Sequence, residues 1–197
     1  MNLSSVALFC GSSSGKDRKY AEIAREFGNK CADLNLLLYY GGAGIGLMWE
    51  AAGALLRRNG KVIGVAPSFF SLNTVLNLNV SQMILVETMS ERKQLLEKSA
   101  DAFVILPGSY GTMDEFFEVI TDAELGLHSK PVAILNAYGY YDSLIALLSH
   151  FKEEGFLRSF HYDLFVVSET VNGLFEKLSQ YKNSNDHLWL SEIKKQG

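Results

Sequence analysis

Residues 102–115 read Ala-Phe-Val-Ile-Leu-Pro-Gly-Ser-Tyr-Gly-Thr-Met-Asp-Glu: a strand, then a proline-glycine turn, then the start of a helix. We expect the strand over 102–106, because consecutive apolar residues are typical of a strand covered on both faces. The helix should begin at Thr112, with Glu115 in its first turn. This arrangement directs backbone N–H groups and the positive end of a helix dipole at one point. Such a point suits a phosphate or another anion.

Glu115 has two interpretations at this position. Residues 112–115 form a Thr-x-x-Glu capping box, in which Thr112 is the N-cap and Glu115 reaches back to its N–H. In the second interpretation the carboxylate acts on a substrate that is bound beside the anion site. The segment alone does not decide between them.

Short apolar runs alternate with longer segments of helical period along the rest of the chain. The predicted strands are 6–10, 36–40, 62–65, 82–86, 102–106, 132–135 and 165–167. The predicted helices are 17–33, 46–59, 90–99, 112–125, 141–153 and 170–182. This alternation predicts an α/β fold: a Rossmann-like, doubly wound, mainly parallel sheet of about seven strands with helices on both faces.

The chain shows no internal repeat or linker, so we expect one nucleotide-binding catalytic domain over residues 1–182. Residues 183–197 should add a terminal helix that docks on the body or on a partner subunit. The segment 68–80 has weak periodicity, which indicates a short irregular helix or a flap over the site.

Composition excludes several classes of function. The net charge of -4 argues against broad contact with nucleic acid or anionic membranes, both of which favour clustered Lys and Arg. No apolar run is long enough to span a membrane. Cys10 and Cys31 lack metal-site spacing and are expected to be buried thiols of a cytoplasmic protein. The four histidines lie far apart, and we expect neither a metal nor a cofactor.

Two further glycine-rich loops follow predicted strands at the same edge of the sheet, at 11–15 and 41–46. The first fails as a P-loop, because three residues separate its glycines and Asp17 follows Lys16. The second fails the dinucleotide fingerprint, because Leu47 stands where the third glycine is required. These failures exclude NAD and flavin. An ordinary strand-to-helix turn remains an alternative to ligand contact. Candidate loop contacts at this edge are Gly11, Ser12, Gly42, Gly44 and Met89.

Residues 89–93, Met-Ser-Glu-Arg-Lys, follow a strand and begin a helix with Ser90 as the expected N-cap. Arg92 and Lys93 lie where the helix dipole disfavours cations, which indicates an anionic partner. Arg92 should approach Glu115 at the neighbouring strand end. There it would bind phosphate and keep the carboxylate ionised.

The segment 107–115 resembles the Pro-Gly-Gly-x-Gly-Thr-x-x-Glu signature of the Lonely Guy (LOG) family. That family comprises cytokinin riboside 5'-monophosphate phosphoribohydrolases, which act in cytokinin biosynthesis and are often mislabelled lysine decarboxylases. The likeness extends from residue 9 to about residue 156. It includes the segments 41–48, 91–93, 118–131, 136–144 and 153–156.

The resemblance implies roles for particular residues. It implies that Arg92 and Glu115 carry catalysis. It implies also that the family's dimer is formed, with the site near or across the subunit interface. The residues that would hold the nucleotide are Lys93, Gly108, Ser109, Tyr110, Gly111, Thr112, Asp114 and Thr121.

The chain departs from the family pattern in four places. Ser109 replaces the second glycine of the signature, Ser90 stands where many members have His, and Ala43 replaces a glycine of the second loop. Phe69 stands where plant members carry a glutamate; it is most simply a core residue, and the alternative is that its ring roofs a base-binding pocket. The base preference cannot be read from the sequence.

The predicted reaction is hydrolysis of the N-glycosidic bond of a nucleoside 5'-monophosphate, either AMP-like or a cytokinin riboside 5'-monophosphate. The products would be the free base and ribose 5-phosphate. Such cleavage passes through an oxocarbenium-like sugar, which a carboxylate stabilises. The alternative is a nucleotide-binding or cofactor-carrying protein without turnover. Lysine decarboxylation would need a lysine Schiff base to pyridoxal phosphate, and no lysine lies in an apolar context; Lys93 has Arg92 and Glu91 as neighbours.

Overall fold

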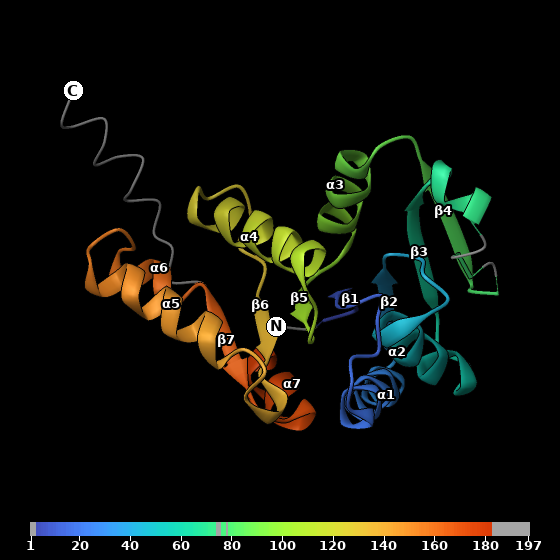
Figure 1. The fold of residues 1–197 in the computed structure, drawn as a ribbon, viewed down its shortest axis with the longest axis horizontal. Coiled ribbons are helices and arrows are strands. Elements are labelled where there is room, and N and C mark those ends of the chain that lie inside the picture. Colours follow the sequence, from blue (N-terminus) through green and yellow to red (C-terminus); the bar gives the residue numbers. More distant parts are fainter. Residues whose placement is uncertain (1–2, 74–75, 78, 183–197) are drawn as a thin grey trace.

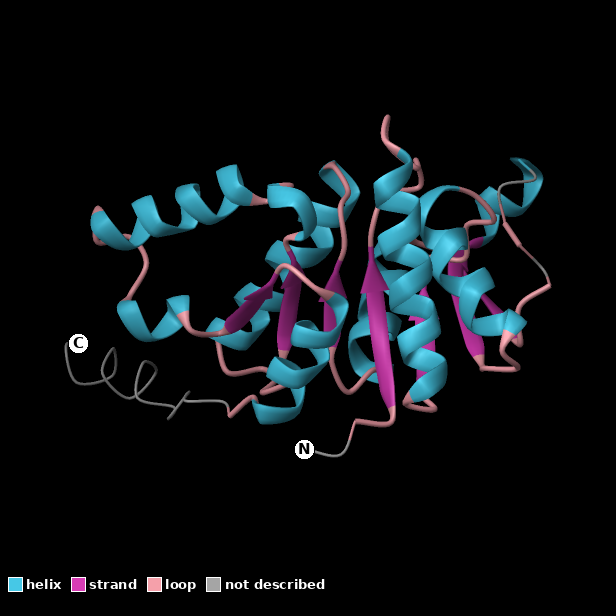
Figure 2. Cartoon of the chain, turned by 90° about the horizontal axis from the view of Figure 1, so that it is seen from below, coloured by secondary structure: helices cyan, strands magenta, loops and turns pink. Residues whose placement is uncertain are grey.

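The computed structural model describes residues 3–73, 76–77 and 79–182, which fold as a seven-stranded, wholly parallel sheet between layers of helices (Figures 1 and 2). The strand order is β4-β3-β2-β1-β5-β6-β7. The predicted α/β doubly wound fold is therefore confirmed, with strand ends shifted by one or two residues. The strands are β1 Ser5–Phe9, β2 Leu37–Tyr40, β3 Val62–Pro67, β4 Gln82–Val86, β5 Phe103–Ile105, β6 Val132–Leu135 and β7 Phe165–Ser168.

Two hydrophobic cores, one on each face, hold the helices against the sheet. Because successive strand residues point to opposite faces, Val6 and Leu8 of β1 enter one core, while Ala7 and Phe9 enter the other. The first core is closed by α1 Arg18–Asp33, α2 Gly46–Arg57 and α7 Val171–Gln180. The second is closed by α3 Met89–Ser99, α4 Tyr110–Glu124, α5 Asp142–Glu153 and α6 Ser159–Tyr162.

The order in which the chain adds strands to the sheet reverses at its centre, between β1 and β5. Strand β1 pairs with β2 on one side and with β5 on the other, where Leu8 lies opposite Val104. The chain first builds outward to β4 and then returns through α3 to β5. The loops after β1 and β5 therefore diverge to opposite faces. The crevice left between them is the usual ligand site of this architecture.

Two predicted helix starts are wrong. Helix α3 begins at Met89, and its N-cap is Thr88 rather than Ser90, with the Thr88 hydroxyl accepting from the Glu91 N–H. Helix α4 begins at Tyr110, so Thr112 is not its N-cap. The capping box therefore does not form. Glu115 lies beyond the first turn, where its carboxylate meets a guanidinium that offers a stronger, charge-assisted bond.

The connection after β3 contains a 3₁₀-helix, η1 Ser68–Asn73, in agreement with the short irregular helix expected within 68–80. A second 3₁₀-helix, η2 Ala137–Gly139, follows β6. Residues 183–197, for which we expected a terminal helix, lie outside the described residues. Within the described ranges, no helix has the length and apolar character needed to cross a membrane.

Candidate active site

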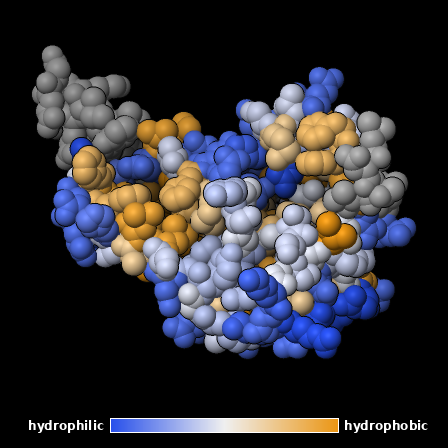
Figure 3. All heavy atoms as spheres, viewed as in Figure 1, coloured by the Kyte–Doolittle hydropathy of each residue, from blue (hydrophilic) through white to orange (hydrophobic). Residues whose placement is uncertain are grey.

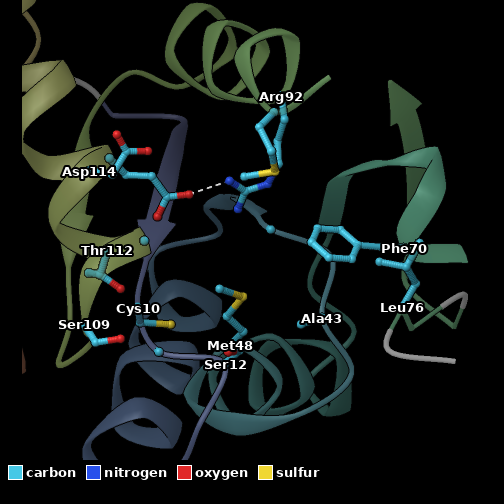
Figure 4. Close-up of a pocket in the computed structure, with 15 residues that line it drawn as sticks. Cys10, Ser12, Ala43, Met48, Phe70, Leu76, Arg92, Ser109, Thr112 and Asp114 are labelled. Atoms are coloured by element: carbon cyan, nitrogen blue, oxygen red, sulfur yellow. Dashed lines mark hydrogen bonds and ion pairs between the residues drawn. The ribbon is translucent and has the colours of Figure 1, made fainter. Parts of the chain in front are cut away.

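A cavity of about 290 Å³ lies at the carboxyl ends of the central strands (Figure 4). Its walls come from the loops after β1, β2 and β5, from the starts of α2, α3 and α4, and from η1. The lining residues are Cys10, Gly11, Ser12, Gly41, Ala43, Met48, Phe70, Leu76, Met89, Arg92, Ser109, Gly111, Thr112, Asp114 and Glu115.

Backbone hydrogen bonds join the loops of this edge. The N–H of Gly11 donates to the carbonyl of Pro107 at 2.9 Å, which ties the loop after β1 to the turn after β5. The N–H of Met48 reaches the carbonyl of Gly11 at 3.4 Å, which brings the start of α2 against the same loop. The three glycine-rich loops therefore form one continuous wall, as their positions at strand ends predicted.

A buried ion pair between Arg92 and Glu115 lies on the cavity wall. The Nη1 of Arg92 is 2.6 Å from the Oε1 of Glu115, and the two residues are 6% and 4% exposed. The Nε of Arg92 donates to the carbonyl of Val65 at 3.1 Å, which fixes the guanidinium plane. A Cβ at Gly41 would collide with that guanidinium, so the close approach requires glycine there. The expected meeting of Arg92 and Glu115 is confirmed.

Electrostatics at the pair are set by burial. Burial raises the pKa of Glu115, and the opposing charge of Arg92 limits that rise. Burial also raises the pKa of the Cys10 thiol well above its ordinary value, and the negative charge of Glu115 adds to the effect. Cys10 therefore contributes a neutral thiol to the wall and not a thiolate nucleophile.

The start of α4 faces the same cavity. Its first turn holds no acidic residue, and the side chain of its N-cap Ser109 makes no capping hydrogen bond. The hydroxyl side chains of Ser109 and Thr112 lie on this wall (Figure 4). Apart from the adjacent residues and the backbone of α4 itself, no described atom lies within 4 Å of where a Cβ of Gly111 would be, so the first turn of α4 is open to a ligand. This end of the cavity suits an anion.

The far end of the cavity is apolar. Phe70 and Leu76 lie across the cavity from Ser109 and Thr112 (Figure 4), and a backbone bridge between Ala43 and Leu76 holds this segment over the second loop. The expectation that Phe69 roofs the pocket is wrong, because Phe69 is 49% exposed and does not line the cavity. The neighbouring Phe70 takes that place.

Lys93 lies behind the wall and not on it. Its Nζ is 3.0 Å from Asp114 Oδ2 and 2.9 Å from Glu118 Oε2. Partial burial would lower the pKa of Lys93, but its hydrogen bonds with Glu118 and Asp114 raise it. Lys93 therefore reaches the cavity only through Asp114, which lines it.

Of the residues that the sequence proposed for the site, the cavity brings together Gly11, Ser12, Met89, Arg92, Ser109, Gly111, Thr112, Asp114 and Glu115. Those that do not line it are Lys93, Gly108, Tyr110, Thr121, Gly42 and Gly44.

The excluded residues face elsewhere for identifiable reasons. Tyr110 is 94% exposed, and Thr121 lies further along α4 beside a separate apolar groove. Gly42, at a φ of 79°, packs against Ala66 and Met83. Gly108 packs against Thr112 behind the turn. For these residues, sequence proximity to the site did not translate into contact with the cavity.

Sequence reasoning missed six lining residues: Cys10, Gly41, Ala43, Met48, Phe70 and Leu76. Gly41 and Ala43 lie within a loop already assigned to the site, and Cys10 and Met48 lie close to such loops, so their positions were a usable signal. Phe70 and Leu76 belong to the segment 68–80, which was expected to form a short irregular helix or a flap over the site, but no motif singled out either side chain.

The residues present do not fit pyridoxal phosphate or a metal centre. Pyridoxal phosphate requires a lysine at the reacting carbon, and the cavity lining contains none. Lys93, the nearby candidate on α3, is ion-paired with two carboxylates. Among the described residues, no group of His, Cys, Asp and Glu has the arrangement of a metal site.

A family model described as "possible lysine decarboxylase" matches residues 48–178. A protein of Oryza sativa subsp. japonica, named as a probable cytokinin riboside 5'-monophosphate phosphoribohydrolase, is 43% identical over 89% of this chain and 78% of its own. A cytokinin riboside 5'-monophosphate phosphoribohydrolase of Arabidopsis thaliana is 39% identical over 89% of this chain and 82% of its own.

Solved structures with the same fold include two proteins of the molybdenum cofactor. The carrier protein of Chlamydomonas reinhardtii has a TM-score of 0.67 and 20% identity, covering 89% of this chain and 96% of its own. The binding protein of Rippkaea orientalis has a TM-score of 0.68 and 19% identity, covering 89% and 95%. At this identity, the likeness shows the fold alone.

Proposed function

The chain belongs to the Lonely Guy (LOG) family, and on that premise we propose that it hydrolyses the N-glycosidic bond of a nucleoside 5'-monophosphate. The products are the free base and ribose 5-phosphate. Support comes from the relatives named as phosphoribohydrolases, which align with about nine-tenths of this chain at up to 43% identity.

The buried Arg92–Glu115 pair is the observation that carries the proposal. It lies between the polar end of the cavity at α4 and the apolar end at Phe70 and Leu76. A nucleotide has the same order of parts: phosphate, sugar, base. With the phosphate at the start of α4 and the base against Phe70, the sugar falls beside Glu115.

Glu115 stabilises the positive charge that develops on the sugar during the reaction. As the bond between C1' and the base nitrogen breaks, its electron pair leaves with the base and the sugar becomes positively charged. An ionised Glu115 beside the ribose offsets that charge and accepts the proton of the attacking water, whose oxygen bonds to C1'. The base gains a proton at its ring nitrogen from solvent on departure, because Asp114, which also lines the cavity, is engaged in an ion pair with Lys93.

Arg92 keeps Glu115 ionised and oriented. Burial alone favours the protonated acid, and a protonated carboxyl would give little stabilisation to a cation. The guanidinium at 2.6 Å opposes that effect and fixes the carboxylate position. Its charge also attracts the anionic substrate to the cavity.

The proposal is tested by incubating the purified protein with AMP, with isopentenyl-adenosine monophosphate and with other nucleoside monophosphates. The released base is measured by chromatography. We expect base release from at least one nucleotide, and its loss in Glu115→Gln, which keeps the size and one acceptor oxygen of the side chain. Full activity in Glu115→Gln would refute the assigned role. Binding of all nucleotides without base release would instead indicate a carrier.

We also propose that the protein works as a homodimer. Helix α4 exposes Tyr110 and Phe117 on the side away from the sheet, and its C-cap residue Leu125 is also exposed; the exposed fractions are 94%, 37% and 37%. Apolar side chains gather over α4, α5 and α6 at the left of Figure 3. A helix that is apolar on both sides is usually covered on both. Tyr110 and Thr121 are then placed to reach a nucleotide in the second copy.

Light scattering coupled to size-exclusion chromatography measures the mass of the particle in solution. A dimer is expected for the native protein, and Phe117→Glu should give a monomer. A monomeric native protein would refute the assembly. We place the activity in the cytoplasm, because Cys10 and Cys31 are both buried free thiols, as in proteins of reducing compartments.

A further inference from the structure

Three consecutive carbonyls at the turn after β5 each accept a hydrogen bond, two from the loop after β6 and one from the loop after β1. The carbonyl of Leu106 accepts from the Tyr141 hydroxyl at 2.8 Å. The carbonyl of Pro107 accepts from the Gly11 N–H at 2.9 Å. The carbonyl of Gly108 accepts from the Tyr140 hydroxyl at 2.7 Å. Every peptide oxygen leading into α4 is therefore held in a fixed direction.

Fixing a carbonyl also fixes the N–H that follows it. The peptide unit is planar and trans, so the C=O of one residue and the N–H of the next point in opposite directions. The Tyr140 hydroxyl holds the Gly108 oxygen and thereby turns the Ser109 N–H away from Tyr140. Ser109 is the N-cap of α4 and lines the cavity. Its N–H is one of the free donors at the end where an anion would bind.

A rotation of the Gly108–Ser109 peptide would reverse the electrostatic field that the bound anion experiences. If the plane between Gly108 and Ser109 turned over, the carbonyl oxygen would take the place of the N–H and would repel an anion. Glycine permits such rotation more readily than other residues, because it has no Cβ. The turn thus needs a restraint that comes from outside it. Tyr140 supplies that restraint at the Gly108 oxygen.

The Tyr140 ring is itself held in place. It makes edge contacts with Tyr20 of α1, with centroids 5.5 Å apart, and with Tyr141, with centroids 4.8 Å apart. The N–H of Tyr141 donates to Asn136 Oδ1 at 2.7 Å, and Asn136 Nδ2 donates to Asp142 Oδ1 at 2.7 Å. Tyr140 therefore stands on a hydrogen-bonded loop at the end of β6, the strand next to β5.

We propose that Tyr140 is a positioning residue for the anion site: its hydroxyl holds the Gly108–Ser109 peptide so that the Ser109 N–H faces the 5'-phosphate. Tyr140 touches neither sugar nor base in this arrangement. The inference rests on the proposed function only in requiring that a sugar phosphate binds at the start of α4. It does not require that the bond is cleaved.

Tyr140→Phe removes one hydroxyl and keeps the ring contacts, and Tyr138→Phe is the matched control. Tyr138 lies in the same loop and also meets Tyr20, with centroids 6.2 Å apart, but no hydrogen bond joins it to the described turn. Binding of ribose 5-phosphate is measured by calorimetry for both variants and the native protein. We expect about a fivefold to tenfold loss of affinity in Tyr140→Phe and none in Tyr138→Phe.

Steady-state kinetics with AMP separate positioning from general damage. Tyr140→Phe should raise KM by a similar factor and leave kcat within about twofold, with a melting temperature within about 2 °C of native. Equal affinity for ribose 5-phosphate in both variants would overturn the inference, as would no binding to the native protein. Binding with the expected difference, but without base release, would retain the inference and refute hydrolysis.

Discussion

Arg92→Met should destabilise the protein far more than the loss of one exposed ion pair would. Arg92 and Glu115 are 6% and 4% exposed, so removing the guanidinium leaves a carboxylate buried without its partner. Breaking a buried pair in this way costs about 3–5 kcal/mol of the free energy of unfolding. For a domain of this size each kcal/mol shifts the melting temperature by about 2–4 °C, so we expect a fall of about 6–20 °C.

The chain offers a control with the same contact distance. Arg58 and Asp33 are also 2.6 Å apart, but their side chains are 47% and 51% exposed. Arg58→Met should therefore cost no more than about 1 kcal/mol. A second variant, Arg92→Met with Glu115→Leu, removes both charges and should recover most of the lost stability, because an apolar pair replaces an ionic one of similar size.

The cost of Arg92→Met should grow as the pH rises. Burial raises the pKa of Glu115 above its ordinary value of 4.5, and Arg92 opposes that rise, so the variant carries a still higher value. A carboxyl whose folded pKa exceeds its unfolded pKa is penalised in the folded protein as pH rises through the window between the two. The melting-temperature difference from native should thus be smaller at roughly pH 5 than at roughly pH 8.

Differential scanning fluorimetry across pH measures all four proteins. A fall of less than about 3 °C in Arg92→Met at neutral pH, or a fall equal to that of Arg58→Met, would refute the buried-pair argument. A double variant as unstable as the single one would refute the attribution to an unpaired charge.

Three further predictions concern the cavity. Gly111→Ala should leave the melting temperature unchanged, because a Cβ there meets open space in the described protein, but it should raise KM for AMP by narrowing the anion end of the cavity. Gly108→Ala should instead lower the melting temperature, because its Cβ collides with Thr112. Equal KM in Gly111→Ala and the native protein would contradict this. At saturating AMP, kcat should fall as pH decreases through a value above 4.5, because Glu115 acts when ionised and burial raises its pKa; a kcat independent of pH down to that value would contradict it. Cys10 and Cys31 should react slowly with a disulfide reagent in the native protein and rapidly in denaturant, because both are buried and burial raises the pKa of each; fast native labelling would show an open cavity wall.

The architecture and the position of the site were predictable from the sequence for one physical reason. Parallel strands are buried on both faces, so β1 and β6 appear as uninterrupted apolar runs, and the loops after such strands meet at one edge. Arg92 and Glu115 could be placed together because each follows a strand end and their charges are opposite. Local pattern and electrostatics pointed to the same edge.

The errors arose where a distant segment overrode a local preference. Residues 112–115 match a capping box, but the turn after β5 starts α4 two residues earlier, at Tyr110, so Ser109 and not Thr112 is the N-cap. The weak periodicity of 68–80 indicated an irregular helix or a flap over the site, but it could not show that Phe70 and Leu76 are the side chains that line the cavity, with Leu76 bridged to Ala43. Thr121 was implied only by the resemblance to the family; six residues beyond Glu115 it lies roughly 120° round α4 from that carboxylate, beside a separate groove.

The reversal of strand order between β1 and β5 has a consequence for how the protein folds. Arg92 belongs to the half of the chain that builds β1 to β4, and Glu115 to the half that builds β5 to β7. The cavity joins both residues to the loops after β1 and β2, and it is complete only after β5 has paired with β1 across some ninety intervening residues, a non-local contact of the kind that forms slowly. Recovery of enzymatic activity during refolding should thus report the docking of the two halves and lag behind the return of helical signal.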